Sequence, residues 1–84
     1  MSYGRLKSIS KAMSAILRHN AAKHGLQLRA DGYISLDDLL TAGPLKRLNA
    51  TAEDVFQVVE ENDKQRFELK RNENFSELWL IRAC

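Results

Sequence analysis

The spacing of apolar residues changes once along this chain, at Arg66, and that change limits which folds the chain can form. Before Arg66, apolar side chains recur every three or four residues, as in amphipathic helices. After it, Phe67 and Leu69 alternate with charged residues, and the segment 75–82 (FSELWLIR) favours a strand. A chain of 84 residues suits one small domain with a modest core. We therefore expect one α+β domain over 1–84, with helices ahead of a β-hairpin.

The first helix is predicted by apolar residues at the spacing i, i+3, i+4, i+7 and i+8, namely Ile9, Ala12, Met13, Ile16 and Leu17. Ser8 or Ser10 could cap its start, and Gly25 is a natural end. Arg18 lies nearly opposite the centre of this apolar stripe, and His19 lies at its edge. The helix should thus expose both polar groups while its other face enters the core.

A short strand and a short helix are expected next. The segment 31–32 (DG) predicts a turn, and the segment 33–34 (YI) is long enough only for a short strand. Ser35 followed by Asp38 resembles a capping box, which would open a helix with leucines facing inward. The segment 43–44 (GP) should break that helix.

The third helix is predicted over 51–62, where Thr51 and Asp54 repeat the capping pattern ahead of an apolar stripe of valines. The order helix, short strand, helix, helix, strand, turn, strand is that of a winged helix, with three helices and a C-terminal β-hairpin wing. In that fold the third helix normally enters the major groove of DNA. Here it carries no lysine or arginine but four carboxylates, on Glu53, Asp54, Glu60 and Glu61. Charge therefore disfavours conventional major-groove binding, whereas a protein-binding winged helix stays open.

Charge and cysteine content exclude several classes of protein. The 13 Lys and Arg exceed the 11 Asp and Glu by a net charge of +2, which is too small to indicate nucleic-acid binding by itself. Cys84 is the single cysteine, which excludes an intrachain disulfide and a Cys/His zinc site of the usual spacing, so we expect no metal. No signal peptide is recognisable, and no segment has the roughly 18–20 apolar residues that span a membrane. We expect an intracellular protein, cytoplasmic or nuclear, that does not enter a membrane.

The positive charges fall into two groups. One is on the first predicted helix and the other at the first strand of the hairpin; they comprise Lys7, Lys11, Arg18, His19 and Lys23, and Lys64, Arg66, Lys70 and Arg71. If the helix packs beside the strand, the two groups would form one basic face. Arginine binds phosphate oxygens in a bidentate manner, and histidine can donate or transfer a proton near neutral pH. The alternative is two solvated basic edges, which are common on small domains. We expect His24 at the surface and Trp79 in the core of the hairpin.

Four stretches of the sequence together resemble one known family. They are SKAMSAILRHNA (10–21), GLQLRADGYISLDDLL (25–40), TAEDVFQVVEENDKQRFEL (51–69) and IRA (81–83). These stretches are similar to the RNA 2′-phosphotransferase family, best known from tRNA splicing, in register from about Ser8 to Ala83. Each piece is weak alone, but LRH, DGY, LL and NDKQRF in that order are specific.

The resemblance implies a function for a longer protein. Family members remove an internal 2′-phosphate from RNA such as tRNA and transfer it to NAD, giving nicotinamide and ADP-ribose 1″,2″-cyclic phosphate. They have an N-terminal winged-helix RNA lobe and a C-terminal NAD lobe. Residues 1–84 would then be the RNA lobe, with the NAD lobe absent because the chain ends at IRAC. NAD would be a co-substrate of the full-length enzyme, with no NAD-binding residue in this chain.

The resemblance also implies which residues act. The family holds and activates the phosphate with an Arg-His-Arg-Arg set, and three of these positions correspond to Arg18, His19 and Arg66. The fourth arginine belongs to the NAD lobe. By the same resemblance, RNA-binding neighbours would be Lys11, Lys64 and Gln65.

Two functions are therefore weighed. In the first, the isolated lobe is a monomer that binds 2′-phosphorylated RNA weakly and does not turn over, with Arg18, His19 and Arg66 converging on one anion-sized site. In the second, the chain is a non-catalytic winged helix that binds nucleic acid or protein.

Overall fold

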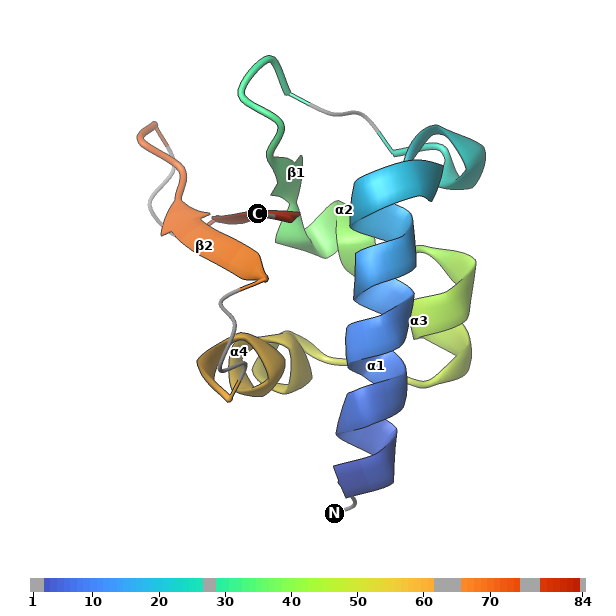
Figure 1. Cartoon of the computed structure of the whole chain (residues 1–84). Coiled ribbons are helices and arrows are strands. Elements are labelled where there is room, and N and C mark those ends of the chain that lie inside the picture. The colour runs from blue at the N-terminus through green and yellow to red at the C-terminus, as the bar shows by residue number, and fades with distance from the viewer. Residues whose placement is uncertain (1–2, 27–28, 62–65, 75–77, 84) are drawn as a thin grey trace.

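The computed structural model describes residues 3–26, 29–61, 66–74 and 78–83. In these segments the chain forms four α-helices and one three-stranded antiparallel sheet (Figure 1). The helices are α1 (Tyr3–Ala15), α2 (Leu36–Leu40), α3 (Gly43–Arg47) and α4 (Ala52–Glu60), and the strands are β1 (Ile34–Ser35), β2 (Phe67–Arg71) and β3 (Trp79–Ala83). The predicted α+β class is confirmed, but the chain has one helix more than the three expected.

Helix α1 does not stop at Ala15. It continues without a break into the π-helix η1 (Ile16–Asn20), and the 3₁₀-helix η2 (Ala22–His24) follows. Gly25 ends this run in the left-handed conformation, with φ 73°, as predicted. The Gly25 N–H donates to the Ala22 carbonyl and the Leu26 N–H donates to the Ala21 carbonyl, which is the hydrogen-bond pattern of a Schellman motif.

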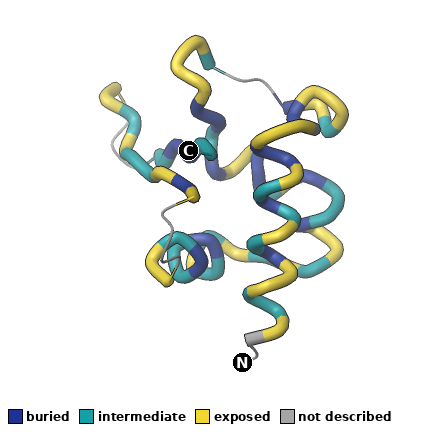
Figure 2. The backbone as a smooth tube through the Cα atoms, viewed as in Figure 1, coloured by how far each residue is buried: buried dark blue, intermediate teal, exposed yellow. Residues whose placement is uncertain are grey.

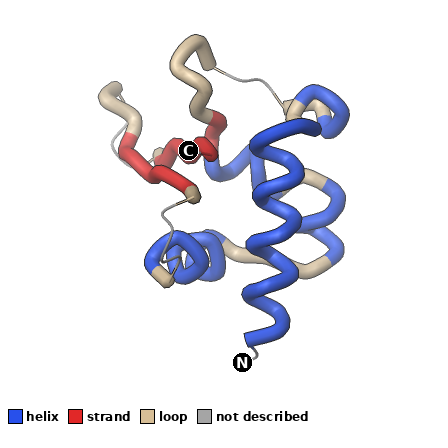
Figure 3. The backbone as a smooth tube through the Cα atoms, viewed as in Figure 1, coloured by secondary structure: helices blue, strands red, loops and turns tan. Residues whose placement is uncertain are grey.

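The strand order is β1-β3-β2, and both pairs are antiparallel. The three strands lie together on one side of the molecule, with α1 and α3 on the other (Figure 3). Phe67, at the start of β2, is opposite Ala83, at the end of β3. The C-terminal end of β3 therefore lies beside the point where the chain enters β2 at Arg66.

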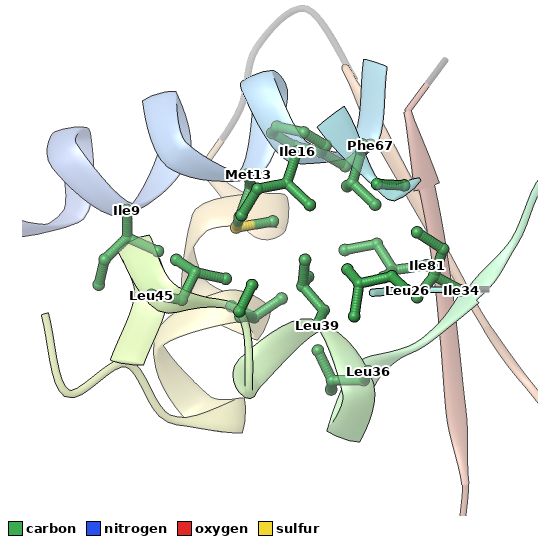
Figure 4. Close-up of a cluster of buried hydrophobic side chains, with 14 of the residues drawn as sticks. Ile9, Met13, Ile16, Leu26, Ile34, Leu36, Leu39, Leu45, Phe67 and Ile81 are labelled. Carbon is green, nitrogen blue, oxygen red and sulfur yellow. The ribbon is translucent and has the colours of Figure 1, made fainter. Parts of the chain in front are cut away.

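The core lies between the helices and one face of the sheet. Its fully buried side chains include Ile9, Met13 and Ile16 from α1 and η1, each at most 1% exposed. They meet Leu39 of α2, Leu45 of α3 and the strand residues Ile34, Phe67 and Ile81 in one buried cluster (Figure 4). Burial of an apolar side chain of this size stabilises the fold by about 1.5–3 kcal/mol.

One predicted helix start is wrong, and one predicted capping box does not form. Helix α1 begins at Tyr3, so Ser8 and Ser10 lie inside it and cap nothing. Ser35 does sit at the N-cap of α2, but its side chain makes no capping hydrogen bond, so the predicted capping box with Asp38 does not form.

The capping box of α4 is confirmed. The Thr51 N–H donates to Asp54 Oδ2 at 3.0 Å, and the Asp54 N–H donates to Thr51 Oγ1 at 3.2 Å. The segment 43–44 follows α2 as expected, but it also opens α3, where Pro44 occupies the first turn. Proline is well tolerated there because the first N–H groups of a helix have no partner inside it.

Candidate functional site

A pocket of about 360 Å³ lies between α1 and the residue that precedes β2. It is lined by Ser10, Lys11, Ser14, Ala15, Arg18, His19 and Arg66. Six of these residues come from one face of α1 and η1, and Arg66 comes from the far end of the chain. Four residues chosen from the sequence, Lys11, Arg18, His19 and Arg66, thus lie around one pocket. Lys64 and Gln65 lie outside the described residues.

The helix positions its polar face by burying the opposite one. Ile9, Met13, Ile16 and Leu17 are buried, while Lys11, Arg18 and His19 are exposed, and Figure 2 shows exposed and buried segments alternating along α1. The π-helix η1 adds a local effect, because its wider turn rotates the chain less from one residue to the next. Arg18 and His19 therefore point in more similar directions than in an α-helix, and both reach the pocket.

Arg66 is held in place by its neighbour. Phe67 is only 4% exposed and belongs to the same buried cluster as Ile16 (Figure 4). Since the side chains of a strand alternate between faces, anchoring Phe67 in the core leaves Arg66 exposed beside α1. The apolar pattern of the sequence thus brings Arg66 to the pocket.

The pocket is positive, and its described lining contains no counter-charge. None of the described residues that line it is acidic. Within the described segments, Lys11, Arg18 and Arg66 make no ion pair. Arg5 behaves differently, since its guanidinium lies 2.9 Å from Asp54 Oδ2. The pocket cations are therefore available to an anion from outside the domain.

Lys70 and Arg71, the other described members of the second basic group, do not join this site. Lys70 lies 3.5 Å from Asp31 Oδ2, and the Arg71 guanidinium stacks over the Trp79 ring at 4.9 Å. Trp79 also meets Phe56 of α4 edge to face at 5.2 Å and is half-buried against the core, so it packs between the hairpin and α4 rather than within the hairpin alone. The predicted basic face is therefore smaller than the sequence suggested.

A second polar cluster covers the outer face of the sheet and is neutralised internally. Lys70 Nζ and the Arg82 guanidinium lie 4.5 and 5.0 Å from the ring centre of Tyr33. Burial, followed by a hydrogen bond to Glu68, raises the pKa of Tyr33. A hydrogen bond from Arg82 lowers the pKa of Glu68, which lies 2.7 Å from that guanidinium. These groups satisfy one another and serve to hold the sheet together.

The sequence singled out the cations of the pocket but missed its hydroxyls. Ser10 and Ser14 line the pocket beside Lys11 and Arg18. Their spacing by one helical turn was visible in the sequence, but serine is common on exposed helix faces and carries no signal alone. His24 is half-buried and does not line the pocket.

The lining suits a particular kind of ligand. Arginine, lysine, histidine and serine are all hydrogen-bond donors, and guanidinium groups match phosphate oxygens in shape and charge. The volume admits a phosphate group together with part of the molecule that carries it. Among the described residues, no group of three or more His, Cys, Asp or Glu could hold a metal ion.

Fold and pocket together define a small α+β domain with a basic pocket whose hydrogen-bond donors suit a phosphate group. Residues 4–84 match the model of the RNA 2′-phosphotransferase, Tpt1 / KptA family. The chain belongs to this family, and the resemblance seen in its sequence is confirmed.

Individual relatives support this membership. The tRNA 2′-phosphotransferase of Saccharomyces cerevisiae is 45% identical over 62 residues, covering 74% of this chain and 27% of that protein. The tRNA 2′-phosphotransferase 1 of Mus musculus is 47% identical over 75 residues, covering 89% of this chain and 29% of that protein. The probable RNA 2′-phosphotransferase of Nostoc punctiforme is 39% identical over 67 residues, covering 80% of this chain and 37% of that protein.

The match extends over a minor part of these relatives, between 27% and 37% of their length. Separately, no helix in the described segments is long and apolar enough to cross a membrane.

Proposed function

We propose that this chain is the RNA lobe of an NAD-dependent RNA 2′-phosphotransferase and that its pocket holds the 2′-phosphate of an RNA such as tRNA. One observation carries the proposal: Arg66, which is distant in sequence from Arg18 and His19, lines the same pocket, and no described residue of that lining has a carboxylate. A partial match to longer relatives fits a chain that supplies one of two lobes. In this proposal the lobe is a monomer.

The same proposal assigns the fold as a winged helix. The antiparallel pair β2 and β3 follows α4, as a wing follows the third helix of that fold, and β1 adds the short third strand. Helix α3 would be an extra turn between the second and third helices. The acidic face of α4 argues against the DNA-binding use of the fold, because Glu53 and Glu60 are exposed there.

Arg18 and Arg66 would clamp the phosphate from two sides. A phosphate that is transferred between oxygens becomes pentacoordinate and more negative at its equatorial oxygens, and fixed guanidinium groups stabilise that charge. His19 would donate a hydrogen bond to the phosphate or move a proton to or from it. Lys11 adds a further positive charge at the pocket wall.

In this proposal NAD is bound by the C-terminal lobe and not by residues of this chain. The geometry of β3 is compatible with a second lobe at this site. Because Ala83 is opposite Phe67, a chain that continues beyond β3 starts beside Arg66. A following lobe would thus reach the phosphate without a long connection.

The test compares two RNA oligonucleotides of the same sequence, one carrying an internal 2′-phosphate and one unmodified, by chemical-shift mapping of the 84-residue chain. We expect residues 18, 19 and 66 to respond preferentially to the 2′-phosphate. Arg66→Gln should lower the affinity for the 2′-phosphorylated oligonucleotide about ten-fold or more. Arg47→Gln, an exposed arginine on α3, removes the same charge and should not.

Equal responses to both oligonucleotides would overturn the proposal. They would favour the second candidate, a non-catalytic winged helix that binds nucleic acid. Binding of neither RNA would leave a protein-binding domain as the better interpretation.

A further inference from the structure

The charges of this chain are strongly segregated along the sequence. Residues 1–30 contain six of the 13 Lys and Arg and none of the 11 Asp and Glu. The net charge of +2 therefore conceals a basic N-terminal third, which forms α1, η1 and η2, and an acidic remainder. Arg5 and Arg29 of this third pair with carboxylates, so its other cations are the ones that can attract a polyanion.

The cations of α1 continue beyond the pocket in one line. Lys7, Lys11, Ser14 and Arg18 follow the spacing i, i+4, i+7 and i+11, which places them on one face of the helix. Lys7 is exposed but does not line the pocket. At a rise of about 1.5 Å per residue, it lies roughly 6 Å beyond Lys11 along the helix axis, towards the N-terminus.

Folding does not account for this arrangement. Two lysines one turn apart on a helix repel each other and lower its stability. In the described part of the chain neither Lys7 nor Lys11 makes an ion pair, and the helix they share contains no carboxylate. Arg5, on the same helix, is instead held by Asp54 and by the Leu48 and Asn49 carbonyls.

We infer that Lys7 and Lys11 bind successive backbone phosphates of an RNA strand whose 2′-phosphate occupies the pocket. The strand would run along α1 from Arg18 towards the N-terminus. A single line of cations engages one strand, whereas double-stranded RNA is bound across two grooves. The substrate is thus an RNA that is single-stranded beside its 2′-phosphate. This inference rests on the proposed function for the pocket. The lysine track, meaning Lys7 and Lys11 as binders of backbone phosphates, can be tested separately.

The experiment measures binding of three RNAs to the 84-residue chain across a range of salt concentrations. The RNAs are a 2′-phosphorylated dinucleotide, a 2′-phosphorylated hexanucleotide and the unmodified hexanucleotide. The variants are Lys7→Gln and, as the matched control, Lys46→Gln. Lys46 is an exposed lysine on α3. Helix α3 packs against the buried face of α1, where Figure 4 shows Ile9 beside Leu45, and so lies away from the face that carries Lys7.

We expect the hexanucleotide to bind more tightly than the dinucleotide. Lys7→Gln should weaken hexanucleotide binding about three- to ten-fold and reduce the slope of log affinity against log salt by about 0.7. It should leave dinucleotide binding unchanged, and Lys46→Gln should leave all three affinities unchanged. The track is refuted if Lys7→Gln leaves the affinity for the hexanucleotide unchanged, or if Lys46→Gln lowers that affinity equally. The unmodified hexanucleotide separates the two proposals. If the 2′-phosphate does not raise the affinity, the assignment of the pocket fails. The effect of Lys7→Gln on hexanucleotide affinity still tests the track in that case.

Discussion

At Arg18, the shape of the side chain should matter as well as its charge. A guanidinium presents a planar fork of N–H groups to two phosphate oxygens, whereas an ammonium offers a point charge. Arg18→Lys should therefore lower the affinity for 2′-phosphorylated RNA about ten-fold, with little change for unmodified RNA. The affinities for both RNAs, measured by binding titrations, check this prediction, with Arg47→Lys on α3 as the control. Unchanged affinities would mean that Arg18 acts only through its charge, and equal losses for both RNAs would mean that its guanidinium does not recognise the 2′-phosphate.

Single residues were predictable from the sequence to different degrees. The exposure of Arg18 followed from the apolar period alone, because the buried stripe defines the opposite face. That Arg66 lies beside it did not, because no local pattern relates residues so far apart; the charge pattern left a shared basic face as one alternative, and the resemblance to a family favoured it. Ser10 and Ser14 were missed because their place in the pocket depends on what packs opposite them.

Among the elements, α4 depends most clearly on its capping box. Thr51→Ala removes the acceptor for the Asp54 N–H and should lower the free energy of unfolding by about 1 kcal/mol. Ser35→Ala is the matched control, since Ser35 holds the same N-cap position on α2 without a side-chain hydrogen bond. Urea unfolding of both variants measures the difference. Equal losses would show that the capping hydrogen bond of Thr51 adds nothing.

The same capping box should make stability depend on pH. Burial raises the pKa of Asp54, but hydrogen bonds from the Thr51 N–H and from Arg5 outweigh it and hold the pKa below its ordinary 3.8. A carboxyl whose pKa is lowered by folding stabilises the fold above its unfolded pKa and loses that effect as pH falls through the folded value. The stability lost in Asp54→Asn should therefore be largest near neutral pH and shrink below about pH 4. Urea unfolding at several pH values checks this, and a constant difference would contradict it.

Elements with a long regular pattern were predictable, and two short irregular ones were not. Helices α1 and α4 and strand β2 each bury one side, so their apolar period was visible. Strand β3 buries the adjacent residues Leu80 and Ile81, and its β-prone composition predicted it. Helix α3 has five residues and begins with a Gly-Pro pair, which signals a break as readily as a start. The π-helix η1 involves a shift of backbone hydrogen bonds, and the pattern of apolar side chains does not reveal such a shift.

For the whole molecule, the proposed division into lobes predicts what the isolated chain cannot do. Mixed with NAD and a 2′-phosphorylated oligonucleotide, the 84-residue chain should bind the RNA and release no nicotinamide. Joining a C-terminal lobe from a longer relative, or adding it as a separate chain, should restore turnover. Nicotinamide release is the measurement, with Arg66→Gln in the joined protein as the control. Turnover by the 84-residue chain alone would refute the division.

The π-helix η1 also changes how relatives of this chain can be compared. A π turn holds one residue more than the α-helical turn it replaces, because each hydrogen bond spans five residues instead of four. A relative with one residue fewer between Ile16 and Asn20 would continue as an ordinary α-helix and could not point Arg18 and His19 in the same directions. A one-residue gap at this place in an alignment would therefore mark a relative in which these two side chains meet the pocket in different directions.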